Sequence, residues 1–151
     1  MRFIKQIPTA VAILEGNREH CGLQGTVRFY QYHCGVLVEA EVLGLPQNNT
    51  GFFGFHIHSG DSCSGADFSA TGGHLTSADV SHPRHMGDLP PLLSYNGRGY
   101  MAVMTDRFSI RDILGRTVVI HRETDDFTTQ PAGNAGEKIC CGVIRKVMRK
   151  M

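Results

Sequence analysis

Six of the eight histidines in this 151-residue chain lie in one central stretch, and an aspartate follows the fifth of them by three residues. In chain order these residues are His56, His58, His74, His82, His85, Asp88 and His121. Imidazole nitrogens and carboxylate oxygens are among the ligands that zinc and copper take in proteins. The cluster therefore predicts a metal centre.

The first pair, His56-Ile57-His58, has a spacing that suits a β-strand. Side chains at positions i and i+2 of a strand point to the same face, so both rings can reach one ion. Taken alone, such a pair fits two surface histidines equally well.

A second set runs from His74 to Asp88, with gaps of seven, two and two residues. Its nitrogen ligands and single carboxylate suit tetrahedral zinc. An all-imidazole set suits copper, which ranks highest in the affinity order of divalent ions. The two sets together favour metal binding over surface histidines.

The elements that must position these side chains are short and β-rich. Gly and Asn turns separate them, and no helical period is convincing, which predicts an antiparallel sandwich or barrel. The expected strands are Thr9–Leu14, Thr26–Tyr32, Gly35–Leu43, Gly51–His58, Gly99–Met104, Thr117–His121 and Cys140–Val147.

Two stretches, Ser59–Asn96 and Arg122–Lys138, read as long polar loops rich in Ser, Gly, Pro, Asp, Thr and His. Loops of this length in a compact domain are uncommon and are usually functional or disordered. Because the candidate ligands lie within or beside both stretches, we expect functional loops.

Composition is that of one soluble globular domain spanning residues 1–151. Hydrophobic residues make up 41% and charged residues 19%, with a net charge of +1, so nothing favours a nucleic-acid or membrane partner. Pro8 interrupts the apolar run near the start, which argues against a signal peptide. We expect a cytoplasmic protein, or a periplasmic or secreted one if a leader was removed. Five cysteines allow at most two disulfides, and in the cytosol the default is none.

Six ordered motifs carry a resemblance to the copper/zinc superoxide dismutase family, which extends from about Thr9 to Ile144. The segment Gly54–His58 resembles the family's GFHVH motif. The other matches are Gly72–His74 with GGHF, Arg84–Leu89 with RHVGDL, Gly115–His121 with GRTLVVH, Gly133–Gly136 with GNAG and Cys141–Ile144 with CGVI.

The resemblance implies an eight-stranded antiparallel Greek-key flattened barrel, an immunoglobulin-like sandwich, with two long functional loops. It implies dismutation of superoxide to oxygen and hydrogen peroxide with copper and zinc as cofactors. His74 would serve both ions as an imidazolate and take part in proton transfer. Copper would bind His56, His58, His74 and His121, and zinc would bind His74, His82, His85 and Asp88.

Three further residues take their expected roles from the resemblance. Asp125 matches an aspartate that accepts N–H bonds from the copper ligand His56 and the zinc ligand His82; the alternative is a solvated loop acid. Cys63 and Cys141 match the family's internal disulfide; the alternative is two reduced thiols. The resemblance assigns no role to Cys21, Cys34 or Cys140.

The chain departs from the family's pattern at Lys138, where the family has an arginine beside copper that guides superoxide. Lysine keeps the charge but lacks the planar fork of donors, so we expect activity, at a lower level. The alternative is a lysine that points into solvent. The second loop is shorter than in eukaryotic members and lacks several charges, which predicts weaker steering of the anion.

A basic tail, Arg145–Met151, stands where eukaryotic dimers have an apolar interface segment. We expect a monomer, or a homodimer without that interface. The alternative function is a non-catalytic copper- or zinc-binding protein, such as a chaperone, on the same fold. Relatives of that kind would be expected to lose copper ligands, and all four are present.

Overall fold

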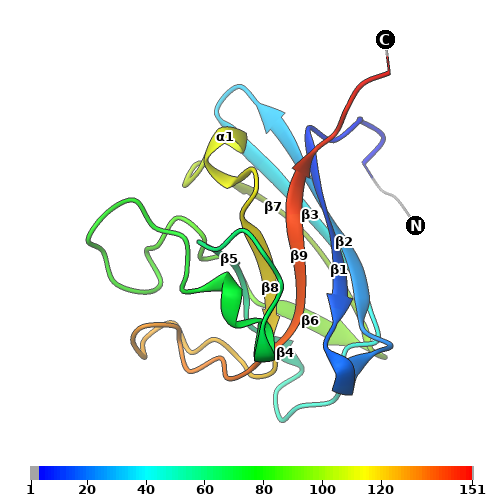
Figure 1. The fold of residues 1–151 in the computed structure, drawn as a ribbon, viewed down its shortest axis with the longest axis vertical. Coiled ribbons are helices and arrows are strands. Elements are labelled where there is room, and N and C mark those ends of the chain that lie inside the picture. The colour runs from blue at the N-terminus through cyan, green and yellow to red at the C-terminus, as the bar shows by residue number, and fades with distance from the viewer. Residues whose placement is uncertain (1–3, 151) are drawn as a thin grey trace.

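Nine strands, all paired antiparallel, form the fold of residues 4–150, the part of the chain that the computed structural model describes (Figure 1). They are β1 (Ala10–Gly16), β2 (Gln24–Tyr32), β3 (Gly35–Leu43), β4 (Phe52–Phe53), β5 (Phe55–His58), β6 (Leu92–Tyr95), β7 (Arg98–Thr105), β8 (Thr117–His121) and β9 (Lys138–Lys146). Three short helical segments join them: η1 (Arg18–His20), η2 (Ala66–Thr71) and α1 (Ile110–Ile113). None of the helices in this part of the chain is long and apolar enough to cross a membrane.

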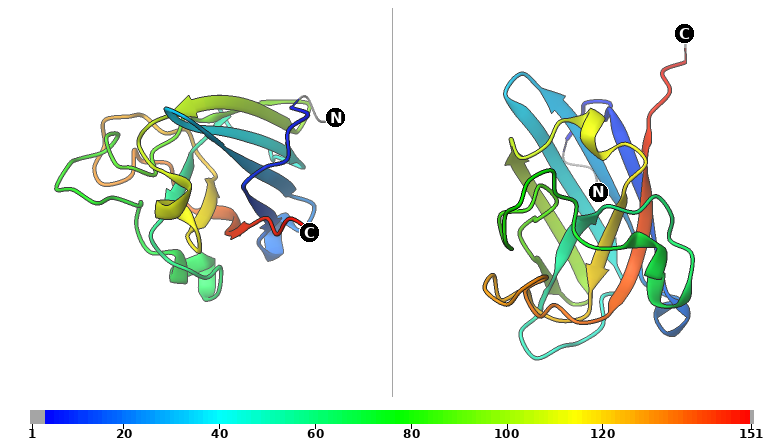
Figure 2. Two further views of the ribbon diagram at one scale, coloured as in Figure 1. Left: turned by 90° about the horizontal axis from the view of Figure 1, so that it is seen from above. Right: turned by 60° about the vertical axis from the view of Figure 1, so that its left-hand side comes forward.

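The strands follow the order β4-β6-β7-β3-β2-β1-β9-β8-β5, and β4 and β5 lie at its two ends. Only Gly54 separates these two strands in the sequence, so the chain itself joins the edges and the sheet curls into a nearly closed barrel (Figure 2). The predicted antiparallel barrel is therefore confirmed.

The strand count is nine, where eight were implied. The predicted strand Gly51–His58 divides at Gly54, because β4 pairs with β6 while β5 pairs with β8. Strand β6 lies inside the stretch expected to be a loop. A tight turn at Asn96 and Gly97, both with positive φ, connects it to β7.

The two remaining irregular segments are the first long loop, residues 59–91, and the second long loop, residues 122–137. Both lie on the side of β5 and β8 that faces away from β1–β3 (Figures 1 and 2). This placement explains the burial of every residue in β5 and β8. One face of these strands packs in the barrel core and the other is covered by the loops.

Alternation along β5 separates the two environments. Phe55 and Ile57 are fully buried in the hydrophobic core, together with Val118 and Ile120 of the neighbouring β8. His56 and His58 therefore project from the opposite face, beneath the loops. The core fixes the strand, and the strand fixes the direction of the two rings.

Candidate metal centre

The first ligand set consists of four histidines from three elements. His56 and His58 come from β5, His121 ends β8, and His74 belongs to the first long loop. One ring nitrogen from each lies within 4.8 Å of the others. A β-bridge between His58 and His74 holds the loop ligand against the strand. The predicted copper set is thus brought together.

The second set consists of His74, His82, His85 and Asp88, whose ligand atoms also lie within 4.8 Å of one another. All four come from the first long loop, and His74 belongs to both sets. Asp88 Oδ1 lies 2.7 Å from Nδ1 of His74, and its Oδ2 lies 3.2 Å from Nδ1 of both His82 and His85. The predicted zinc set is thus also brought together.

The first long loop docks on β5 through main-chain hydrogen bonds. The N–H of Ile57 donates to Gly87 O over 2.9 Å, and the N–H of Leu75 donates to Ile57 O over 2.8 Å. A Cβ at position 87 would lie 2.1 Å from Ile57 O, so this approach requires glycine. In the Arg84–Leu89 motif, Gly87 therefore provides the docking contact and the adjacent Asp88 provides a candidate ligand.

Asp125 joins the two sets, as predicted. Its carboxylate, 2% exposed, accepts hydrogen bonds from Nε2 of His56 over 2.7 Å and from Nε2 of His82 over 2.8 Å. The Phe127 N–H also donates to it over 2.8 Å. Gly133, at φ +72°, passes so close that a Cβ there would lie 2.0 Å from Asp125 Oδ1. Only glycine leaves room for this link.

Backbone carbonyls orient the other two rings of the copper set. Nδ1 of His58 donates to Gly72 O over 2.8 Å, and Nδ1 of His121 donates to Gly136 O over 3.1 Å. Each ring therefore carries its proton on Nδ1 and presents the lone pair of Nε2, and these two Nε2 atoms lie 3.1 Å apart. The tautomers suit ligands of a shared cation.

Four buried ring nitrogens lack a hydrogen-bond partner within residues 4–150: Nδ1 of His56, Nε2 of His74, Nδ1 of His82 and Nδ1 of His85. Buried polar atoms are almost always paired, so four in one cluster require an explanation. All four belong to the two ligand sets. These nitrogens and the nearby carboxylate fit one copper ion and one zinc ion.

The protonation states also favour cations. Burial lowers the pKa of His58 to about 2 and that of His121 to about 3, and burial also lowers the pKa of His56. Burial alone would raise the pKa of Asp88 and Asp125, but hydrogen bonds from the imidazoles outweigh it and both pKa values are lowered. At neutral pH these three rings are neutral and both acids are ionised.

Lys138 begins β9 and pairs with His121 across the sheet. Its Nζ donates to Thr71 Oγ1 over 2.7 Å and to Gly72 O over 3.0 Å. The second acceptor is the same carbonyl that orients His58. The charge of Lys138 also contributes to the lowered pKa values of His58 and His121.

The predicted disulfide between Cys63 and Cys141 is confirmed. It ties the first long loop, which contains Cys63, to β9, which contains Cys141. Of the remaining cysteines, Cys21 and Cys34 are exposed and Cys140 is buried.

Two side chains that the sequence does not single out also contact the zinc set. Arg107, between β7 and α1, and Gln130, in the second long loop, bind main-chain groups of the first long loop. Thr71, which accepts a hydrogen bond from Lys138, is a further residue that the sequence does not single out. Arg107 and Gln130 act on backbone groups that are distant in the sequence, so no motif or spacing marks them.

Comparisons with known proteins agree with this geometry. Residues 23–144 match the family model described as copper/zinc superoxide dismutase. The superoxide dismutase (Cu-Zn) of Deinococcus radiodurans is 35% identical over 144 residues, covering 82% of this chain and 78% of that protein. Superoxide dismutase (Cu-Zn) A of Xenopus laevis is 34% identical over 152 residues, covering 89% of this chain and 95% of that protein.

A solved structure has the same fold. It is a double mutant of a SOD-like protein from Bacillus subtilis, with a TM-score of 0.77 and 29% sequence identity, and the match covers 88% of this chain and 95% of that chain. The family model spans most of the sequence, and both ligand sets it would require are assembled in the structure. The chain therefore belongs to the copper/zinc superoxide dismutase family.

Proposed function

We propose that this chain catalyses the dismutation of superoxide, in which two superoxide anions and two protons give one dioxygen and one hydrogen peroxide. The observation that carries the proposal is the complete set of four copper-type histidines, one of which, His74, it shares with a complete zinc-type set. A set reduced to three or fewer ligands would instead fit a protein that only binds metal.

Copper, when bound by His56, His58, His74 and His121, supplies the one-electron chemistry, whereas zinc does no redox work. The chain itself supplies a fixed donor set. In His56, His58 and His121, the ring nitrogen that is not the candidate ligand is hydrogen-bonded to Asp125 or to a backbone carbonyl. The ligand nitrogens therefore need little rearrangement on metal binding.

His74 is the residue to which we assign proton transfer. Its Nδ1 lies 2.7 Å from Asp88, on the zinc side, and its buried Nε2 belongs to the copper side. A proton held at Nε2 is therefore beside the place where superoxide reacts, while Asp88 keeps the ring in position. The second proton comes from solvent.

Lys138 is the residue to which we assign attraction of the anion. An ammonium group has three N–H donors, and two of them are used by Thr71 and Gly72. The third is left for superoxide. The two fixed contacts hold the charge near the copper set, which supports a guiding role over that of a solvent-facing lysine.

The test is metal analysis of the purified protein combined with a superoxide assay. We expect saturation at one copper and one zinc per chain, and dismutation that depends on copper. Saturation at one metal in total would contradict the shared-histidine site. Binding of both metals without dismutation would favour a non-catalytic metal protein instead.

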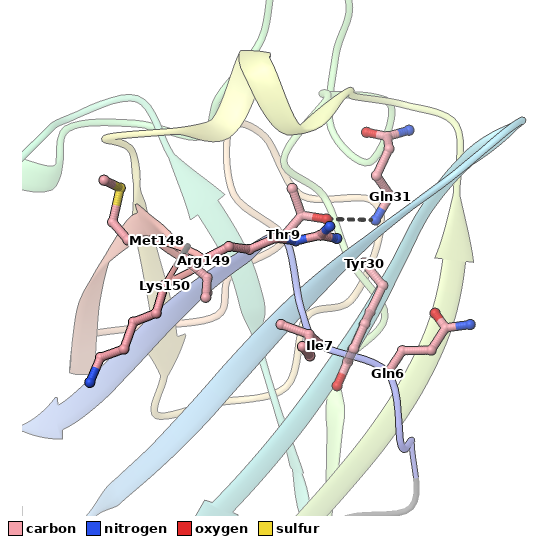
Figure 3. Close-up of a pocket in the computed structure, with 9 residues that line it drawn as sticks. Gln6, Ile7, Thr9, Tyr30, Gln31, Met148, Arg149 and Lys150 are labelled. Atoms are coloured by element: carbon pink, nitrogen blue, oxygen red, sulfur yellow. Dashed lines mark hydrogen bonds between the residues drawn. The ribbon is translucent and has the colours of Figure 1, made fainter.

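We further propose that the chain is a monomer, or a homodimer that does not associate through its C-terminal segment. That segment extends past the end of the barrel, and its last residues line a shallow pocket beside the N-terminal segment (Figure 3). Its exposed side chains are predominantly basic: Arg145, Lys146, Arg149 and Lys150. Repulsion between two such tails opposes pairing. Because the proposed association does not use this segment, sedimentation equilibrium should give the same association state for wild type and for a variant truncated after Lys146.

A further inference from the structure

The zinc ligands lie on a segment with almost no regular secondary structure. Between His74 and Asp88 the described chain forms turns and bends but neither a helix nor a strand. A ligand set needs its side chains held close to the geometry that the ion requires. Something outside this segment must therefore fix its backbone.

Gln130 fixes the backbone at His82. Its Oε1 accepts a hydrogen bond from the His82 N–H over 2.9 Å, and its Nε2 donates to His82 O over 2.8 Å. One amide side chain thus satisfies both main-chain groups of a zinc ligand. Asp125 meanwhile binds the ring of the same residue, so His82 is held at backbone and side chain.

Arg107 fixes the backbone around the other two ligands of this segment. Its Nη1 lies 2.6 Å from Pro83 O, 3.3 Å from His85 O and 3.4 Å from Asp88 O. Three carbonyl dipoles that converge on one point repel one another unless a cation lies between them. The guanidinium group supplies that cation and holds the turn from His85 to Asp88.

We propose that Arg107 and Gln130 are positioning residues that set the affinity of the zinc site by holding the backbone of His82, His85 and Asp88. Neither residue contributes a ligand. Without them the zinc-free segment would sample more conformations, and binding would have to order it again. The proposal rests on the zinc site of the proposed function, but it does not depend on dismutation.

The experiment measures zinc affinity of the full-length protein by competition with a chromogenic chelator, using zinc ion itself as the probe. We expect Arg107→Met and Gln130→Ala each to raise the zinc dissociation constant by about tenfold, the lower end of the effect of removing an outer hydrogen-bond partner. Arg107→Lys should retain most of the wild-type zinc affinity, because an ammonium group can also donate to the carbonyl groups that bind Arg107.

Matched controls are available for both residues. Arg111, on α1, and Gln47, in the β3–β4 connection, have no side-chain hydrogen bond within residues 4–150, so Arg111→Met and Gln47→Ala should leave zinc affinity unchanged. A second measurement separates positioning from general destabilisation. In the zinc-free variants, amide hydrogen exchange should quicken between His82 and Asp88 and remain unchanged in the barrel strands.

Zinc dissociation constants within twofold of wild type in both Arg107→Met and Gln130→Ala would overturn the proposal, as would an equal loss in the control variants. If Arg107→Met does not fold, Arg107→Lys and Gln130→Ala decide the question by the same criterion. Wild-type protein that binds zinc but does not dismutate superoxide refutes the proposed function alone. Wild-type protein that binds no zinc refutes both.

Discussion

Replacement of Lys138 tests the proposed guidance of superoxide most directly. In Lys138→Met the charge is lost, but the neighbouring structure keeps its other contacts: Thr71 Oγ1 still donates to Phe68 O, and Gly72 O still accepts from His58. The variant should therefore fold and bind both metals. Any change in rate then reports the ammonium group.

The size of the effect follows from the position of the charge. Two unit charges 4 Å apart interact by about 1 kcal/mol in water and about 4 kcal/mol near a protein surface. Because Lys138 is only partly buried, water screens its charge and the lower part of that range applies. We take about 1–2 kcal/mol, which corresponds to about a five- to thirtyfold loss in the rate constant.

Two further substitutions give the sign of the effect. Lys138→Arg should raise the rate, because a guanidinium group has five donors and can keep both present contacts with donors to spare. Lys138→Glu should lower the rate more than Lys138→Met does, since a like charge would face the incoming anion. Added salt should lower the wild-type rate modestly, through screening.

The assay follows superoxide decay by stopped-flow at several ionic strengths, with copper content measured for every sample. Lys146→Met is the matched control, because Lys146 is exposed and lies at the other end of β9. A wild-type rate that neither salt nor any of the three substitutions at Lys138 alters would refute the reasoning. Superoxide would then be recognised without this side chain.

Four other predictions follow from the same geometry. His121→Ala should abolish dismutation and leave zinc bound, whereas His85→Ala should release zinc and lower the melting temperature; metal analysis and calorimetry distinguish them, and equal behaviour would contradict the division of ligands. Gly133→Ala should displace Asp125 and weaken zinc binding in a chelator competition, and unchanged affinity would refute the close approach. Cys63→Ser removes a disulfide that spans 78 residues of sequence and should lower the free energy of unfolding by about 4 kcal/mol in denaturant titrations, and an unchanged free energy would contradict a stabilising cross-link. Because burial raises the pKa of Cys140 to about 12, its thiol should resist alkylation at pH 8 until the protein unfolds, while the two exposed thiols react; mass spectrometry of the labelled protein checks this.

The barrel, the His56 and His58 pair and the second ligand set could be predicted from local signals in the sequence, whereas the assignment of His74 and His121 to the copper set came from the resemblance to the family. Alternating apolar residues mark the strands, and the spacing within HxH and His-x2-His-x2-Asp marks the ligands. The strand β6 was missed because it is only four residues long and follows a polar stretch. The Asn96-Gly97 turn beside it is a strong hairpin signal and would have revealed it.

Other features have no local signal. The helix α1 has four residues, too few to show a period, although Ser109 and Asp112 form a capping box around it. The division of the predicted strand Gly51–His58 depends on which partners β4 and β5 meet across the barrel. Arg107 likewise binds carbonyls at least nineteen residues away, and only the folded chain reveals such contacts.

The strand order also constrains when the metal centre can form during synthesis. His121 of the copper set ends β8, which joins the rest of the sheet through β9, and β9 in turn pairs with β1; β5, on the other side of β8, is the last strand of the order. Strand β1 must therefore wait for β9 to be synthesised before the barrel can close. Such long-range pairing makes folding slow. The copper set is accordingly expected to assemble only after β9 has been synthesised, and a chain truncated before β9 should not assemble a stable copper site.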